Sequence, residues 1–131
     1  MIVVDTSALI AILQVEPDAQ ALAAAMQSAP AVAMSAVTLL ETGIVIQARR
    51  GPAGVDDLTR LLTGAGVITV PFDERMGVMA IEAFAKFGRD SQSGAKLNFG
   101  DCASYALAKS LNAPLLFKGA DFSQTDIISA V

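Results

Sequence analysis

Four acidic side chains lie inside or directly beside apolar segments of the sequence, where a charge needs a partner: Asp5, Glu41, Asp101 and Asp121. The other nine of the thirteen acidic residues fit helix caps, turns or solvated faces. Carboxylates that converge repel one another and raise one another's pKa values unless a cation offsets their charge. Mg²⁺ and Mn²⁺ do this, because they prefer oxygen ligands and keep water or phosphate oxygens as further ligands. The chemistry that such a group could perform is metal-assisted hydrolysis of a phosphodiester bond.

Each acid also has a purely structural interpretation. Asn98 is predicted to cap a helix in which Asp101 is the third residue, where a short acidic side chain satisfies free N–H groups and meets the positive end of the helix dipole. Glu41 fits such an explanation less well. On a helix it shares a face with Val37 and Ile44, so we expect its carboxylate on or beside the buried stripe, where a charge is costly unless paired or coordinated. Single acids leave both interpretations open, whereas four together favour a shared site that Asn98 supports by capping the helix.

The residue types that are absent narrow the chemistry. The chain has no histidine, which excludes histidine-dependent nucleophile systems, histidine acid–base nucleases and HExxH zinc sites. Its one cysteine, Cys102, allows neither an internal disulfide nor a cysteine-cluster zinc site, and we interpret it as a small buried hydrophobe. If the chain is an enzyme, carboxylates or a metal must therefore carry the proton chemistry. A net charge of −4 argues against a simple basic nucleic-acid-binding module, although bound cations would offset a local acidic cluster.

Length and composition predict one ordered domain over residues 1–131. More than half of the residues are hydrophobic and only 17% are charged, which is enough apolar surface for a real core. No apolar run approaches the ~20 residues that cross a bilayer. The first residues, "MIVVDTSALIAIL", have neither a basic segment nor a small-residue cleavage site, so we expect a cytoplasmic protein.

Short apolar segments alternate with helical ones along the chain, which predicts an α/β fold in three layers, with a mainly parallel sheet covered by helices on both faces. The predicted strands are residues 2–4, 31–35, 67–72 and 114–117. The predicted helices are residues 8–14, 17–28, 36–50, 55–62, 74–87 and a last one that carries Asp101.

Sites in such folds lie just beyond the carboxyl ends of the strands. Asp5 is the first residue after the first strand, and Thr6 or Ser7 is predicted to cap the helix that follows. Ser35 is predicted to cap the long helix that carries Glu41. The polar stretch "GRDSQSGAK", residues 88–96, is a candidate mobile loop.

Three segments carry a recognisable pattern: "IVVDTSALIAIL", "SAVTLLETGIVI" and "LNFGDCASYALAKSLNAPLLFKGADF". In order and spacing the chain resembles the PIN-domain ribonucleases, and specifically the VapC-type toxins of bacterial toxin–antitoxin modules. The resemblance covers almost the whole chain. The combination of "LNFGDC", "YALA" and "LLFKG" makes it fairly specific, whereas "DTSAL" alone is common.

The resemblance implies the fold and function of that family. Its metal-binding acids correspond to Asp5, Glu41 and Asp101, with a less uniform fourth acid at Asp121, and these four would also be the catalytic set. Thr6 or Ser7 of the "DTS" motif is similarly placed to support the site. The resemblance further implies endonucleolytic cleavage of RNA with Mg²⁺ or Mn²⁺, a homodimer, and inhibition by a cognate VapB-type antitoxin.

The chain departs from the family pattern in two places. Close relatives often have a second acid in a "KGDDF" stretch, where this chain has Ala120 before Asp121. If the acid missing at 120 were a ligand, metal affinity or activity would be weakened. The loop before "LNFGDC" usually has a "GKGRHP"-like run and here reads "GRDSQSGAK", which leaves Arg89 and Lys96 as candidates for phosphate contact.

Three other functions deserve comparison with a nuclease. A phosphoacceptor receiver domain also has a parallel sheet and a lysine after the last main strand, as Lys118 is, but it needs paired acids that Asp5 lacks. Nucleotide-binding enzymes are poorly supported, because no GxxxxGK[ST] or GxGxxG motif is present. The serious alternative is a PIN-fold protein that acts mainly as an antitoxin-binding or regulatory partner and has weak or no catalytic activity.

Overall fold

The computed structural model describes all residues from 1 to 131. Its central sheet has four parallel strands in the order β3-β2-β1-β4. The strands are short: β1 (Ile2–Val4), β2 (Val32–Ser35), β3 (Ile68–Val70) and β4 (Leu115–Leu116). Because all four run in the same direction, the residues that follow them meet at one edge of the sheet.

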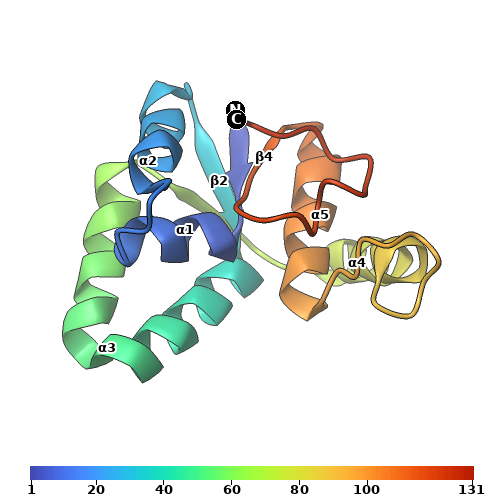
Figure 1. The fold of residues 1–131 in the computed structure, drawn as a ribbon, viewed down its shortest axis with the longest axis horizontal. Helices are drawn as coiled ribbons and strands as arrows, with labels where there is room; N and C mark the ends of the chain where they lie inside the picture. The colour runs from blue at the N-terminus through green and yellow to red at the C-terminus, as the bar shows by residue number, and fades with distance from the viewer.

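Five helices cover the sheet and give the predicted three-layer α/β/α fold (Figure 1). They are α1 (Thr6–Leu13), α2 (Ala19–Ser28), α3 (Ala36–Gly64), α4 (Glu74–Phe87) and α5 (Phe99–Leu111). In Figure 1, α1, α2 and the second half of α3 lie on one face of the sheet, and α4 and α5 lie on the other. The two ends of the chain lie side by side, away from the starts of α1 and α3.

Alternation along the strands separates two hydrophobic cores. Val3 belongs to the core beneath α4 and α5, and its neighbour Val4 belongs to the core beneath α1 and α2. On β4, Leu115 and Leu116 divide in the same way. A strand buried on both faces must be apolar at every position, which explains the uninterrupted "IVV" run that ends at Asp5.

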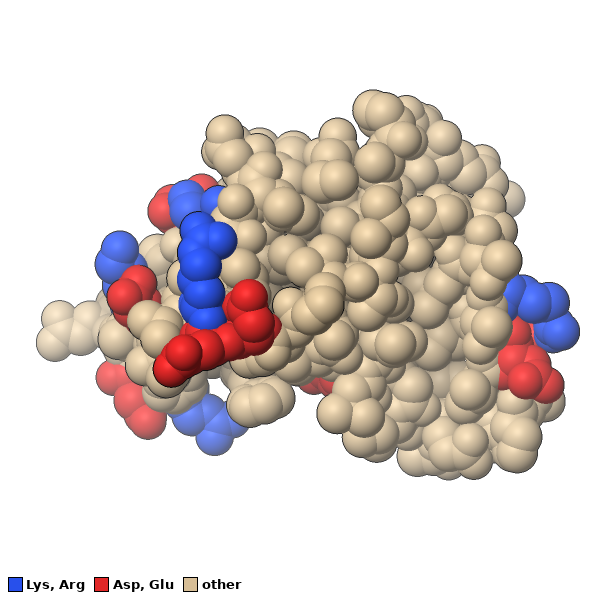
Figure 2. All heavy atoms as spheres, turned by 180° about the vertical axis from the view of Figure 1, so that it is seen from behind, with Lys and Arg blue, Asp and Glu red and all other residues tan.

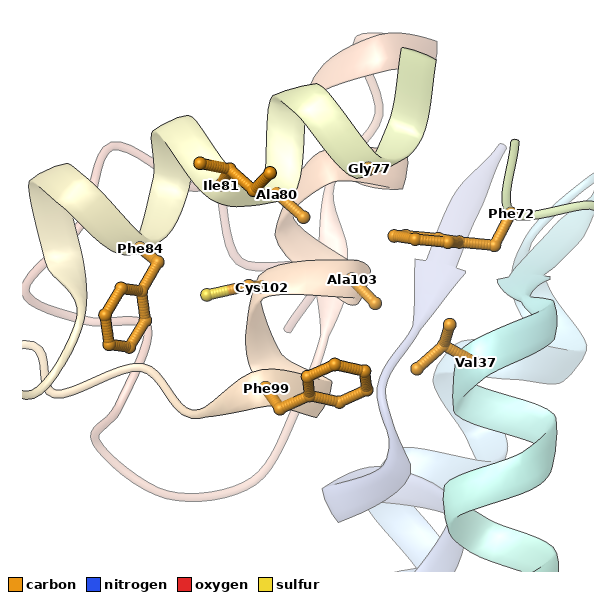
Figure 3. A pocket seen from close by; sticks show the side chains of 9 residues that line it. All are labelled: Val37, Phe72, Gly77, Ala80, Ile81, Phe84, Phe99, Cys102 and Ala103. Carbon is orange, nitrogen blue, oxygen red and sulfur yellow. The ribbon is translucent and has the colours of Figure 1, made fainter. Parts of the chain in front are cut away.

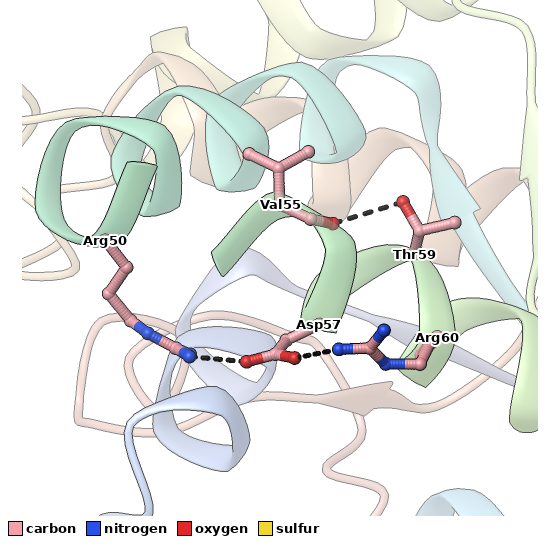
Figure 4. Close-up of polar contacts among 5 residues, drawn as sticks. All are labelled: Arg50, Val55, Asp57, Thr59 and Arg60. Atoms are coloured by element: carbon pink, nitrogen blue, oxygen red, sulfur yellow. Dashed lines mark hydrogen bonds and ion pairs between the residues drawn. The ribbon is translucent and has the colours of Figure 1, made fainter. Parts of the chain in front are cut away.

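The long helix α3 contains a sharp kink rather than running straight. Gly51 has φ 65° and ψ −159°, a left-handed backbone that favours glycine, and Pro52 begins the next helical segment, where its missing N–H costs no hydrogen bond. The two predicted helices 36–50 and 55–62 are therefore the two halves of α3. An ion pair between Arg50 and Asp57 joins the halves across the kink (Figure 4).

Two of the predicted helix caps are confirmed and one is wrong. Ser35 caps α3 by accepting a hydrogen bond from the Val37 N–H at 3.1 Å, and Asp73 caps α4 by accepting one from the Met76 N–H at 3.0 Å. The predicted cap of α1 was wrong. Asp5, rather than Thr6 or Ser7, is its N-cap.

Charged side chains are distributed unevenly over the surface. Figure 2 shows them gathered at the two ends of one face, with a broad uncharged area between them. Exposed apolar side chains occur on three helices; they include Leu40 and Ile44 on α3, Ile81 on α4 and Phe99 on α5. No helix is long and apolar enough to cross a membrane.

Replacing Leu107 by Ala is expected to lower the free energy of unfolding by about 2–5 kcal/mol, because it leaves a cavity in the core beneath α5. Leu107 is only 2% exposed. The control is Leu111→Ala on the same helix, where the side chain is 39% exposed and the expected loss is about 1 kcal/mol or less. Urea unfolding followed by circular dichroism measures both, and equal losses would contradict this description of the core.

Candidate active site

The residues predicted to form a site come together at the carboxyl edge of the sheet. Asp5 follows β1 and is only 2% exposed, and Glu41 projects from the first half of α3. Asp101 lies in the first turn of α5 and is 9% exposed. Three segments far apart in the sequence therefore place their acids beside one another, because parallel strands bring the starts of the following helices to the same edge.

Asp5 is held by hydrogen bonds to both of its carboxylate oxygens. Oδ2 accepts from the Ser7 N–H at 3.0 Å and from the Ser7 hydroxyl at 2.7 Å, which makes Asp5 the cap of α1. Oδ1 accepts from the Ser104 hydroxyl of α5 at 2.6 Å. The Ser7 Oγ in turn accepts from the Lys118 N–H at 3.0 Å. Ser7 thus supports the site by tying Asp5 to the segment after β4.

Glu41 contacts both neighbouring helices. Its Oε1 accepts a hydrogen bond from the Thr6 hydroxyl at 2.6 Å, and its carboxylate lies against the backbone of Gly100. A Cβ at position 100 would come within 2.3 Å of both Glu41 oxygens, so only glycine leaves space for the carboxylate there. Glu41 is half-buried, but Ile44 is 60% exposed. The apolar stripe predicted around Glu41 is therefore partly wrong, and Thr38, Thr42 and Ile46 are the buried positions.

Asp101 caps its helix and lies close to the other acids. The Asp101 N–H donates to Asn98 Oδ1 at 2.9 Å, and the Asn98 N–H donates to Asp101 Oδ2 at 3.0 Å, which is a complete capping box. The pKa of Asp101 is raised to about 7, chiefly by burial and also by the charges of Asp5, Asp121 and Glu41, against the opposing hydrogen bond from the Asn98 backbone. The predicted cap is confirmed, and the three other acids lie close enough to repel its charge.

Asp121 differs from the other three acids. It is exposed, in the loop after β4, and no hydrogen bond or ion pair engages its side chain. Its one link to the site is its effect on the pKa of Asp101. The fourth acid therefore lies at the rim of the site rather than within its hydrogen-bonded centre.

No cation of the protein neutralises these acids. None of Asp5, Glu41, Asp101 and Asp121 forms an ion pair, and the nearby Lys118 is engaged by Glu16 and Asp18. Arg50 is paired with Asp57, and this pairing, together with the one to Arg60, lowers the pKa of Asp57.

The donor atoms suit a hard divalent cation, although the four carboxylates do not lie close enough together to enclose one. All donors are carboxylate oxygens, but no group of three or more acidic, cysteine or histidine side chains is placed to hold an ion by itself. Mg²⁺ commonly binds through one or two carboxylates and completes its shell with water and substrate phosphate. The residues present fit that mode of binding and not a closed cage of protein ligands.

Sequence reasoning missed several residues that build the site. Thr38 and Thr42 have no exposed surface, and they come before and after Glu41 in the sequence. Ser104 is also fully buried and Gly100 makes room for Glu41. The signal was present in the sequence, because threonines at positions i and i+4 on an otherwise apolar helix face require polar partners.

The chain matches a known sequence family and several known proteins. The sequence model described as "PIN domain" matches residues 2–128. The chain belongs to the PIN-domain family. Ribonuclease VapC28 of Mycobacterium tuberculosis is 46% identical to this PIN domain over 129 residues, which cover 98% of this chain and 97% of the relative. Ribonuclease VapC of Mycolicibacterium smegmatis is also 46% identical, over 125 residues that cover 95% and 96% of the two chains.

Solved structures confirm the fold of this PIN domain. The crystal structure of Mycobacterium tuberculosis VapC20, described as a toxin that cleaves the sarcin–ricin loop, matches with a TM-score of 0.79 at 19% identity. The match covers 98% of this chain and 97% of that one. The predicted three-layer α/β fold and the resemblance to VapC-type PIN domains are thus confirmed.

One apolar hollow of this PIN domain is separate from the acids. A cavity of about 440 Å³ lies between α4, α5 and the start of α3, and Figure 3 shows Phe72, Phe84, Phe99 and Val37 around it. None of the four acids lines it. Cys102 does, and burial raises the pKa of its thiol to about 11. The cysteine is therefore the buried hydrophobe that was predicted.

In metal-free protein, Asp101→Asn is expected to raise Tm by an amount that grows with pH. The folded state holds the Asp101 proton more tightly than the ordinary pKa of 3.8 would allow. The stability that this provides to the wild type is complete below about pH 4 and is lost as the pH rises through about 7. Asparagine does not titrate, and its oxygen can still accept the Asn98 N–H.

Thermal unfolding in EDTA between about pH 5 and about pH 8 measures this difference. Asp56→Asn, at an exposed position in the second half of α3, controls for the change in net charge. A Tm difference between Asp101→Asn and wild type that stayed constant over this range would contradict the raised pKa of Asp101.

Proposed function

We propose that this chain is the ribonuclease toxin of a toxin–antitoxin pair and hydrolyses RNA with Mg²⁺ or Mn²⁺ at Asp5, Glu41, Asp101 and Asp121. The observation that carries the proposal is the meeting of acids from three separate segments with no protein cation to neutralise them. Support for RNA as substrate comes from the relatives named VapC ribonuclease, which share 46% of their residues with the chain. Buried like charges persist at a cost to stability when function needs them.

The roles of the four acids follow from their surroundings. Asp5 has both oxygens hydrogen-bonded and is the most rigidly held, so it is the fixed ligand of the set. Glu41 has Oε1 bonded and Oε2 without a hydrogen bond, so Oε2 is available to a cation. Asp101 is held through Oδ2 by Asn98 and leaves Oδ1 without a hydrogen bond. Asp121 is exposed and would join from the rim when substrate is bound.

A divalent cation bound there would lower the pKa of a coordinated water and stabilise negative charge on the phosphate and the leaving oxygen. The protein's own contribution is to hold the oxygen ligands in place and to leave them without a lysine or arginine partner. Thr6 and Ser7 orient Glu41 and Asp5, and Asn98 fixes the first turn of α5 under Asp101. Because no lysine or arginine is paired with these acids, the bound cation would provide the positive charge that attracts an RNA phosphate to them.

Protein partners would account for the exposed apolar side chains. A VapB-type antitoxin and a second copy of the chain are the two partners proposed here, and the chain offers two apolar hollows. One is the cavity beside Phe99, and the other lies between the halves of α3 and is lined by Leu39, Leu40 and Ile44. The setting proposed for this pair is the cytoplasm, where its RNA substrate is found.

The purified chain, freed of antitoxin, is expected to cleave RNA when Mg²⁺ or Mn²⁺ is added and to stop when EDTA is added. The control is the double variant Asp5→Ala with Asp101→Ala, which removes the most buried ligands. Denaturing gels of a defined RNA measure cleavage. If the wild type is no more active than this variant, the nuclease proposal is wrong and a PIN-fold protein that only binds or regulates is left.

Gly100→Ala is expected to lower RNA cleavage by about tenfold or more, the usual cost of disturbing a ligand's support, while the protein still folds. The new Cβ would come within 2.3 Å of both Glu41 oxygens, and the carboxylate at the end of a flexible side chain would move away. Gly43→Ala on α3 is the matched control, because a Cβ there meets nothing within 4 Å. Equal activities of the two variants would contradict the placement of Glu41 in the site.

A further inference from the structure

Two buried threonines of α3 contact the site without being acids or their direct partners. Thr38 and Thr42 are four residues apart, so they lie on the same side of the helix, with Glu41 close beside them. Both have no exposed surface. A hydroxyl buried in this way must find a hydrogen-bond partner, and each of the two finds another hydroxyl rather than a backbone carbonyl.

The first chain of hydroxyls ends at Asp5. Ser104 Oγ lies 2.6 Å from Asp5 Oδ1 and 3.2 Å from Thr38 Oγ1. The Ser104 hydroxyl donates to Asp5 Oδ1, and a serine hydroxyl has only this one proton to give. Thr38 must then donate to Ser104. The direction of both hydrogen bonds is therefore fixed. The hydrogen bond from Thr38 helps to keep the Ser104 hydroxyl pointing at Asp5.

The second chain ends at Glu41 and follows the same logic. The Thr42 hydroxyl donates to Thr6 Oγ1 at 3.2 Å, and the Thr6 hydroxyl donates to Glu41 Oε1 at 2.6 Å. This second series of hydrogen bonds joins α3 to α1, whereas the first series joins α3 to α5. One side of α3 therefore orients carboxylates that come from two different parts of the sequence.

We propose that Thr38 and Thr42 are positioning residues of the carboxylate site: each hydroxyl orients a second hydroxyl, Ser104 or Thr6, which holds Asp5 or Glu41 in the arrangement that binds a divalent cation. The proposal rests on the function proposed above. Hydrogen bonds in a chain of donors strengthen one another, so removal of the distant member weakens the bond to the carboxylate. Groups behind metal ligands commonly change metal affinity by about 10–100-fold.

The test replaces each threonine by valine, which has nearly the same shape but no hydroxyl, and by serine, which keeps the hydroxyl. Thr59→Val is the matched control, because the exposed Thr59 donates only to the Val55 carbonyl of its own helix (Figure 4). Calorimetric titration with Mn²⁺ gives the dissociation constant without reference to activity. RNA cleavage at several Mn²⁺ concentrations gives kcat and KM for the same proteins.

Thr38→Val and Thr42→Val are each expected to weaken Mn²⁺ binding by about tenfold, with Thr38→Ser and Thr42→Ser restoring most of it. Excess Mn²⁺ should recover part of the lost kcat. Val variants that bind Mn²⁺ as tightly as Thr59→Val would overturn the proposal. So would Ser variants as weak as the Val variants, because the methyl group rather than the hydroxyl would then matter.

Double variants test whether the two chains are separate. Thr38→Val should add little to the effect of Ser104→Ala, because both act on Asp5 through one chain, whereas Thr42→Val should add its full effect. The opposite pattern would overturn the proposed connections. If Thr38→Val does not fold, as judged by circular dichroism, the Thr42 variants test the second chain alone.

The wild type distinguishes this inference from the function on which it rests. Wild-type protein that neither binds Mn²⁺ nor cleaves RNA would overturn the proposed function and the positioning role with it. Wild-type protein that does both, with unchanged Val variants, would overturn the positioning role alone.

Discussion

The hydrogen bond from Ser104 to Asp5 is the interaction on which the rest of the site depends. It joins residues 99 positions apart and fixes α5 against the end of β1. With α5 in this place, Gly100 lies against Glu41, and Asp101 lies close enough to Asp5 for the charge of Asp5 to raise its pKa. The bond also satisfies one oxygen of a carboxylate that is almost fully buried, which would otherwise be expensive.

The acids of this site each perform a structural task that keeps them in place. Asp5 caps α1 and Asp101 completes the capping box of α5, so a substitution that removes their side-chain oxygens also removes a cap. At the same time burial and mutual repulsion make Asp101 hard to ionise. The site therefore carries a local cost in stability at neutral pH, as is common where a protein binds charged ligands, and a bound cation would relieve it.

Much of this arrangement could be predicted from the sequence, for identifiable reasons. Buried parallel strands leave uninterrupted runs such as "IVV", and the cap at Asn98 and the break at Gly51 are local signals that tertiary structure did not override. The cap of α1 was assigned to Thr6 or Ser7 instead of Asp5, because the sequence does not show whether a strand-ending acid turns towards its own helix. Thr38, Thr42 and Ser104 were missed as a group, since the spacing of the two threonines indicates that they need polar partners but does not show which distant residues provide them.

The uneven charge distribution sets the physical character of any association through the uncharged area in Figure 2. Contacts made there would lack ion pairs, and those that bury apolar side chains lose strength on cooling and gain strength in sulfate or phosphate buffers. Sodium chloride, which at 0.1 M screens the interaction of exposed charges more than about 10 Å apart, would have little influence on them. A complex held in this way would respond to temperature and to the kind of salt far more than to its concentration, which is the reverse of the behaviour of an interface built from ion pairs.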